Sequence, residues 1–139
     1  MDNYILAYYQ GIVNGSIVVG RWIRRLYEII VQGIDDGTYL FDQAKANRVI
    51  RFVERFAHHN KGKLAPGRLE LSLWQKAALS VMFGIVEEDG ARVFREVVFV
   101  VGRKCGKTLL ASSVLQWMLF ADGEFGVEAY CLAPKLDQA

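Results

Sequence analysis

The chain has 139 residues, enough for one ordinary domain or part of a larger one, and 53% of them are apolar, which is enough for a buried core. Charged residues make up 23% of the sequence, which excludes a disordered or fibrous chain, and the net charge of +2 is too small to predict nucleic-acid binding from the total. The two cysteines, Cys105 and Cys131, match no metal-binding pattern and are typical of reduced thiols in a cytosolic protein.

An uncharged stretch over residues 4–20 raises the question of a membrane span, because it runs for 17 positions. It contains Gln10, Asn14, Ser16 and three glycines, and no basic segment precedes it. We therefore expect a helix, a turn and a second helix here, and no membrane segment.

Three helices are expected in a helical N-terminal region, residues 1–60. Asn14-Gly15 should end the first, Gly33 is a candidate C-cap for the second, and Asp42 is a candidate N-cap for the third. The expected apolar stripes are Ile5, Tyr8, Tyr9 and Ile12; Trp22, Leu26, Ile29 and Ile30; and Val49, Phe52, Val53 and Phe56.

Two polar clusters in the third helix have a structural and a functional interpretation. Arg48, Arg51 and Arg55 share one helical face, and a solvated face is favoured over a nucleic-acid contact because Glu54 interrupts the surface beside it. The adjacent pair His58-His59 does not share a face, so a metal site is not expected there.

A polar segment rich in glycine and proline, residues 61–68, predicts a linker. It separates the helical region from residues 69–139, in which the chemically informative motifs lie.

Gln75 has two interpretations. With Ser72 it fits the capping box S-x-x-Q, which opens a helix that Gly84 closes. Its amide also offers an acceptor and a donor together, which match the N6 and N7 edge of adenine. A glutamine beside an aromatic residue, here Trp74, upstream of a phosphate-binding loop favours the adenine contact, and one side chain can serve in both roles.

A strand, a glycine loop and a helix are predicted in succession near the end of the chain. Residues 97–101 are apolar and predict a buried strand. Gly102-Arg103-Lys104-Cys105-Gly106-Lys107-Thr108 follows, and residues 109–120 predict a helix. In this context the loop predicts a phosphate site, with Lys107 on the β- and γ-phosphates and the Thr108 hydroxyl on Mg²⁺.

The loop departs from the pattern G-x-x-x-x-G-K-[ST], because Val101 stands where the first glycine is expected. A solvated basic turn is the alternative interpretation. The charge distribution favours the phosphate site, since residues 91–108 carry a net +4 and residues 109–139 a net −3.

Residues 127–133 predict a second parallel strand, joined to the first by a right-handed crossover. The expected fold class is therefore α/β, with a P-loop NTPase-type parallel sheet that is incomplete in this chain and is preceded by the helical N-terminal region.

Nearly the whole chain resembles the N-terminal part of the large terminase subunit of tailed bacteriophages, the ATP-driven motor that packages viral DNA. Gly102–Thr108 is similar to that family's variant Walker A, and Trp74-Gln75 resembles its adenine-binding Q motif. Asp122-Gly123-Glu124 and residues 133–139 resemble the segment after its first βα unit, and residues 1–60 its lid-like leading region.

The resemblance implies ATP and Mg²⁺ as cofactors and a set of nucleotide contacts. Lys107 is implied as a phosphate contact and catalytic cation, Arg103 as a cis-acting cation on the γ-phosphate, and Thr108 as the metal ligand. Cys105 occupies a variable family position, so no chemical role is implied for its thiol. The implied nucleotide-binding residues are Trp74, Gln75, Gly102, Arg103, Lys104, Cys105, Gly106, Lys107 and Thr108.

The implied partners are double-stranded DNA, a portal protein and a small terminase subunit, around a homo-oligomeric ring in the host cytoplasm. The family's Walker B strand, coupling motif and C-terminal nuclease domain have no counterpart in residues 1–139. We therefore expect a fragment, truncated before Walker B, that binds ATP weakly and hydrolyses it negligibly by itself, whereas the full-length protein is expected to be an ATPase. A helicase-like DNA-dependent ATPase and a non-catalytic, degenerate P-loop module stay open as alternatives.

Overall fold

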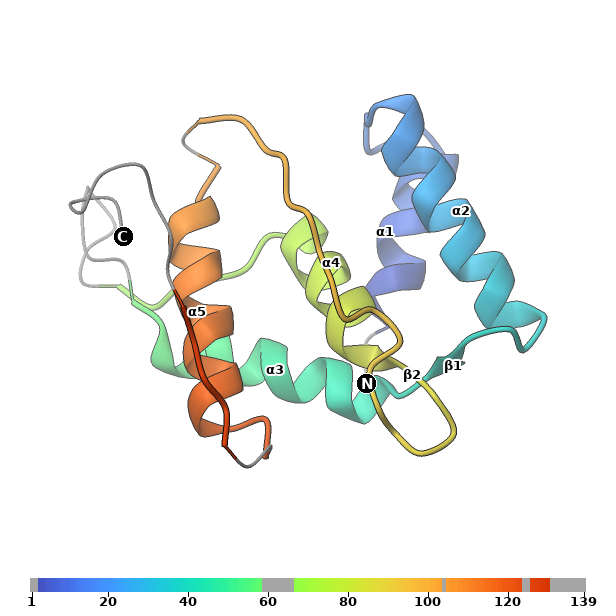
Figure 1. Cartoon of the computed structure of the whole chain (residues 1–139). Helices are drawn as coiled ribbons and strands as arrows, with labels where there is room; N and C mark the ends of the chain where they lie inside the picture. Colours follow the sequence, from blue (N-terminus) through green and yellow to red (C-terminus); the bar gives the residue numbers. More distant parts are fainter. Residues whose placement is uncertain (1–2, 59–66, 104, 124–125, 131–139) are drawn as a thin grey trace. The chain divides into compact units, whose positions relative to one another are not determined.

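The computed structural model describes residues 3–58, 67–103, 105–123 and 126–130, and it divides the chain into two compact units, Met1–Phe99 and Val100–Ala139. Figure 1 shows the elements in chain order. They are α1 (Tyr4–Val13), α2 (Arg21–Asp35), β1 (Leu40–Phe41), α3 (Gln43–Phe56), α4 (Leu73–Gly84), β2 (Ile85–Val86) and α5 (Lys107–Phe120).

The first helix forms as predicted. The Asn3 side chain caps α1 by accepting a hydrogen bond from the Leu6 N–H at 3.0 Å, and Asn14 is the C-cap. Three of its four predicted stripe residues, Ile5, Tyr8 and Ile12, are buried, whereas Tyr9 is half-buried. The stripe packs on α2 and α4, which lie beside α1 in Figure 1.

The predicted stripe of α2 is wrong except at Ile30. The helix buries Tyr27, Ile30 and Gly33, and leaves Trp22, Leu26 and Ile29 exposed. The reason is a contact outside the helix: the Tyr27 ring meets the Tyr8 ring of α1 edge-on, with centroids 4.8 Å apart.

The prediction of Gly33 as a C-cap is also wrong, because α2 continues to Asp35 and Asp36 is its C-cap. Gly33 has a packing role instead. A Cβ atom there would lie 2.3 Å from Cδ2 of Tyr39, so the absence of a side chain lets the aromatic ring rest against the helix.

The third and fourth helices pack on each other and complete the core of the first unit. Asp42 caps α3 as predicted, accepting from the Lys45 N–H at 2.9 Å. Val49 and Val53 of the predicted stripe are buried, Phe52 is half-buried, and Phe56 is exposed because it lies at the end of the helix. Gly84 ends α4, as predicted.

A small antiparallel sheet of β1 and β2 closes this unit, with Leu40 opposite Val86 and Phe41 opposite Ile85. The chain then turns at residues 87–90, where Gly90 has a φ of 82°, and returns so that the Val93 N–H donates to the Ile85 carbonyl at 3.1 Å. This sheet was not among the elements expected from the sequence.

The second unit contains α5, which covers the predicted helix at residues 109–120 and begins two residues earlier, at Lys107. Leu110, Ser113 and Trp117 are its buried residues. The helix ends at Ala121, and the Trp117 indole donates to Oδ1 of Asp122 at 3.2 Å, which ties the residue after the C-cap to the last turn.

The structure does not show the strand predicted at residues 97–101, since the segment has no strand hydrogen bonding and Val98 is 89% exposed. Residues 127–130 of the second predicted strand likewise form none, and residues 131–133 lie outside the described part of the chain. A strand exists only as part of a hydrogen-bonded ladder, and an apolar run does not supply its own partner. The part of the chain that the structure describes therefore has mixed helices and one two-stranded antiparallel sheet, and no parallel sheet.

The predicted linker at residues 61–68 falls mostly outside the described residues, and the division of the chain at that point stays a prediction. Among the residues that the structure does describe, no helix is long and apolar enough to cross a membrane.

Candidate functional site

The junction between the glycine loop and α5 is the candidate phosphate-binding feature of the second unit. Gly106 has φ 72° and ψ 13°, the left-handed conformation that glycine adopts without strain, and Lys107 begins the helix directly after it. The Leu110 N–H donates to the Gly106 carbonyl at 3.0 Å, which closes the first turn. The turn holds no acidic residue, so the positive end of the helix dipole is not neutralised from within the helix.

The side chains around this junction are suited to an anion. Arg103, Lys107 and Thr108 are exposed, and Lys104 lies outside the described residues. Gly102 is exposed as well. Two cations and a hydroxyl therefore stand at a helix N-terminus, and this set fits phosphate oxygens together with a hard cation such as Mg²⁺.

Cys105 lies between the two glycines as an exposed free thiol. Its Sγ lies 3.7 Å from the Arg103 carbonyl oxygen, to which it is a weak donor. No further role follows from this contact.

Gln75 on α4 is the candidate base-binding residue of the first unit, and the predicted capping box is confirmed. Both the N–H and the hydroxyl of Ser72 donate to Oε1 of Gln75, each at 2.9 Å. The amide is thus held with its oxygen toward Ser72, and its nitrogen takes no part in these two bonds.

Trp74 is half-buried beside Gln75, and its ring lies 6.0 Å from that of Phe99 at an interplanar angle of 33°.

Trp74 and Gln75 belong to the first unit, whereas Gly102, Arg103 and residues 105–108 belong to the second. Each group is ordered within its own unit, by the capping box in the first and by the glycine-to-helix junction in the second. Adenine and phosphate roles for them stay predictions.

Sequence reasoning missed the residues that hold the start of α4, namely Glu54 of α3 and Lys76 of α4, which form an ion pair at 2.9 Å. The available signal was Glu54 itself, an acidic residue next to buried Val53 that interrupts the exposed arginine face. No local spacing rule joins positions that lie so far apart in the sequence.

The alternative sites considered from the sequence gain no support. Within the described ranges, no cluster of three or more His, Cys, Asp or Glu residues could hold a metal ion. Arg48, Arg51 and Arg55 are exposed along α3, which both a solvated face and a nucleic-acid contact require, so the choice between them stays a prediction. His59 lies outside the described residues, and His58 pairs with Arg68 in a single antiparallel bridge.

Comparison with known families places the second half of the chain among ATPase domains. The matching family is described as "Terminase large subunit, ATPase domain", and its model matches residues 73–139. The chain from α4 onward is therefore similar to the ATPase domain of terminase large subunits, and the resemblance noted from the sequence is confirmed over residues 73–139. Comparisons with curated proteins and with solved structures found no match.

Proposed function

We propose that this chain is an ATP-binding part of a viral DNA-packaging motor. The observation that carries the proposal is the family match over residues 73–139, which includes both candidate motifs. A second observation supports it: α5 begins at Lys107, directly after a left-handed glycine, which is the local geometry that a phosphate-binding loop requires.

Each proposed contact follows from the chemistry of its side chain. Lys107 and Arg103 neutralise charge on the β- and γ-phosphates, and backbone N–H groups from Gly102 to Thr108 donate to phosphate oxygens. The Thr108 hydroxyl is a ligand of Mg²⁺, which when bound withdraws charge from the phosphates. The Gln75 amide recognises the adenine, and Trp74 supports that side chain.

The remaining expectations rest on the family alone. They are coupling of ATP hydrolysis to translocation of double-stranded DNA, a portal protein and a small terminase subunit as partners, a homo-oligomeric ring, and work in the host cytoplasm. The parallel sheet of the P-loop fold also stays a prediction, supported by the family match and not by the described strands.

The phosphate contacts are tested by titrating the 139-residue chain with a fluorescent ATP analogue, with and without Mg²⁺. We expect Mg²⁺-dependent binding that Lys107→Ala weakens by roughly tenfold or more, because a charged hydrogen bond contributes about 1.5–3 kcal/mol. Lys45→Ala is the matched control, since Lys45 is an exposed lysine of α3 whose Nζ donates to the Gly90 carbonyl. Equal affinities of the wild type and Lys107→Ala, or no binding at all, would refute the proposal.

The adenine contact needs a variant that keeps the capping box. Gln75→Glu retains an oxygen that can accept from Ser72, but it replaces the amide donor with a second carboxylate oxygen. We expect it to fold like the wild type and to bind ATP more weakly. Ser72→Ala is the converse control, because it removes the Ser72 hydroxyl from the capping box and keeps the bond from the Ser72 N–H to the Gln75 amide.

A further inference from the structure

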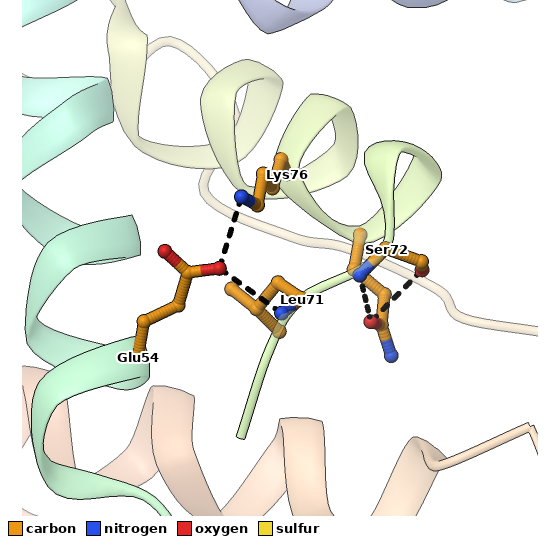
Figure 2. A network of polar contacts seen from close by, with 5 residues as sticks. Glu54, Leu71, Ser72 and Lys76 are labelled. Atoms are coloured by element: carbon orange, nitrogen blue, oxygen red, sulfur yellow. Dashed lines mark hydrogen bonds and ion pairs between the residues drawn. The ribbon is translucent and has the colours of Figure 1, made fainter. Parts of the chain in front are cut away.

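Glu54 links α3 to the first turn of α4 through one carboxylate oxygen. Its Oε1 accepts a hydrogen bond from the Leu71 N–H at 3.1 Å and pairs with Nζ of Lys76 at 2.9 Å, as Figure 2 shows. Both side chains of the ion pair are largely covered, with 29% of Glu54 and 21% of Lys76 exposed. The pair is therefore better shielded from solvent than an ordinary surface ion pair.

The two contacts of Glu54 hold both ends of the segment that contains Gln75. Leu71 directly precedes Ser72, whose N–H donates to Gln75 Oε1, and Lys76 directly follows Gln75. Lys76 is held from a second direction as well, because its Nζ lies 5.2 Å from the centre of the Tyr4 ring on α1. The start of α4 is thus fixed relative to two neighbouring helices.

The hydrogen bonds of Gln75 determine which nucleobase its amide can recognise. Its Oε1 already accepts from the N–H and the hydroxyl of Ser72, and a carbonyl oxygen has two lone pairs. Oε1 can accept a hydrogen bond from the N6 amino group of adenine only if the Ser72 hydroxyl stops donating to it, which rotation of the hydroxyl allows. The Ser72 backbone N–H still donates to Oε1 and keeps the amide in place. Guanine has an acceptor, O6, at the same edge and would face Oε1 without a hydrogen bond. The position of the Ser72 backbone therefore controls the choice between the two bases.

We propose that Glu54 is a positioning residue for nucleobase selection, acting on Gln75 through the Leu71–Ser72 backbone and Lys76. The inference rests on the proposed function, in which Gln75 contacts adenine. Loss of the Glu54 carboxylate would leave the glycine loop unchanged, but the Gln75 amide would be held less firmly. The preference for ATP over GTP should therefore fall more than the affinity for the phosphates.

The test is the ratio of the affinities for fluorescent ATP and GTP analogues, measured on the 139-residue chain. This ratio is unaffected by a partly unfolded sample, because an inactive fraction lowers both apparent affinities equally. We expect Glu54→Ala to reduce the ATP preference by about three- to tenfold, toward the value of Gln75→Ala, and the double variant to show no further reduction. Glu54→Gln should restore part of the preference, since its amide oxygen can still accept from the Leu71 N–H.

Glu28→Gln is the matched control, because Glu28 forms an ion pair with Arg25 at 2.7 Å on the exposed surface of α2. It should leave the ratio unchanged. A normal ratio in Glu54→Ala, combined with a reduced one in Gln75→Ala, would overturn the positioning role alone. A normal ratio in Gln75→Ala would overturn both base-reading roles while ATP binding stands, and no nucleotide binding by the wild type would overturn the proposed function itself.

Discussion

The Tyr27 ring of α2 packs edge-on against the Tyr8 ring of α1, with the ring centroids 4.8 Å apart and the planes at 70°. This contact decides which face of α2 is buried. It also places a phenol inside the core cluster that Ile5, Ile12 and Ile30 form around it. Burial of this hydroxyl raises the pKa of Tyr27 above its ordinary value, and the nearby Tyr8 adds to the effect.

The first prediction concerns stability in alkali. Tyrosines of the unfolded chain ionise near the ordinary pKa of 10.0, whereas the folded state keeps Tyr27 protonated to higher pH. Between pH 10.0 and the pH at which the folded state loses the Tyr27 proton, the unfolded state binds fewer protons than the folded state. Over this range the free energy of unfolding should fall by about 1.4 kcal/mol per pH unit for this group. Urea unfolding of the wild type and of Tyr27→Phe, measured from about pH 9 to about pH 11, should show a steeper decline for the wild type. Parallel declines would contradict the burial of the phenol.

The face of α2 shows what helical periodicity can and cannot predict. The sequence predicted a helix here, and the structure has one, because apolar residues recur at the right spacing. Two apolar faces fit that spacing, however, and Trp22 lies on the one that is exposed. The contact with Tyr8 of α1 determines which face of α2 is buried. The apolar pattern of α2 alone contains no information about that partner.

For the candidate site residues as well, the local features were predictable from the sequence and the long-range contacts were not. The start of α5 after Gly106 and the capping box of Gln75 are local features, encoded within a few residues, and both were predictable. The contact of Glu54 with α4 is long-range and was not. The strand expected at residues 97–101 is not present in the structure for a related reason, since a strand depends on a hydrogen-bonded partner elsewhere in the chain.

The second prediction tests the close approach at Gly33. Gly33→Ala should destabilise the protein by about 1–3 kcal/mol, because the new methyl group would overlap the Tyr39 ring. The higher helix propensity of alanine would by itself stabilise the helix by about 1 kcal/mol, so a net loss identifies the steric effect. Urea unfolding followed by far-UV circular dichroism gives the difference.

Gln32→Ala is the control for helix propensity, since Gln32 is an exposed neighbour in α2. It should be neutral or slightly stabilising. If Gly33→Ala behaved in the same way, the ring of Tyr39 would not lie against this glycine in solution. In a Tyr39→Ala background the cost of Gly33→Ala should largely disappear.

The third prediction separates the structural role of Gln75 from its proposed role in binding. Ser72→Ala should reduce the free energy of unfolding by about 1 kcal/mol, because α4 loses the side chain at its N-cap. The proposed preference for ATP over GTP should be retained or should rise, since removing the hydroxyl frees one lone pair of Oε1. Loss of the preference together with stability would show that the capping box itself, and not the freed oxygen, sets the base selectivity.

The last prediction concerns the end of α5. The indole Nε1–H of Trp117 donates to Oδ1 of Asp122, and the Asp122 N–H donates to the Trp117 carbonyl at 3.0 Å, so two hydrogen bonds join these residues. Asp122→Ala removes the acceptor from a buried indole and should destabilise the protein by about 1–3 kcal/mol. Asp122→Asn keeps an oxygen in the same place and should retain most of that stability. Chemical unfolding followed by circular dichroism compares the two variants, and equal losses would mean that the carboxylate acts through its charge and not as the acceptor for Trp117.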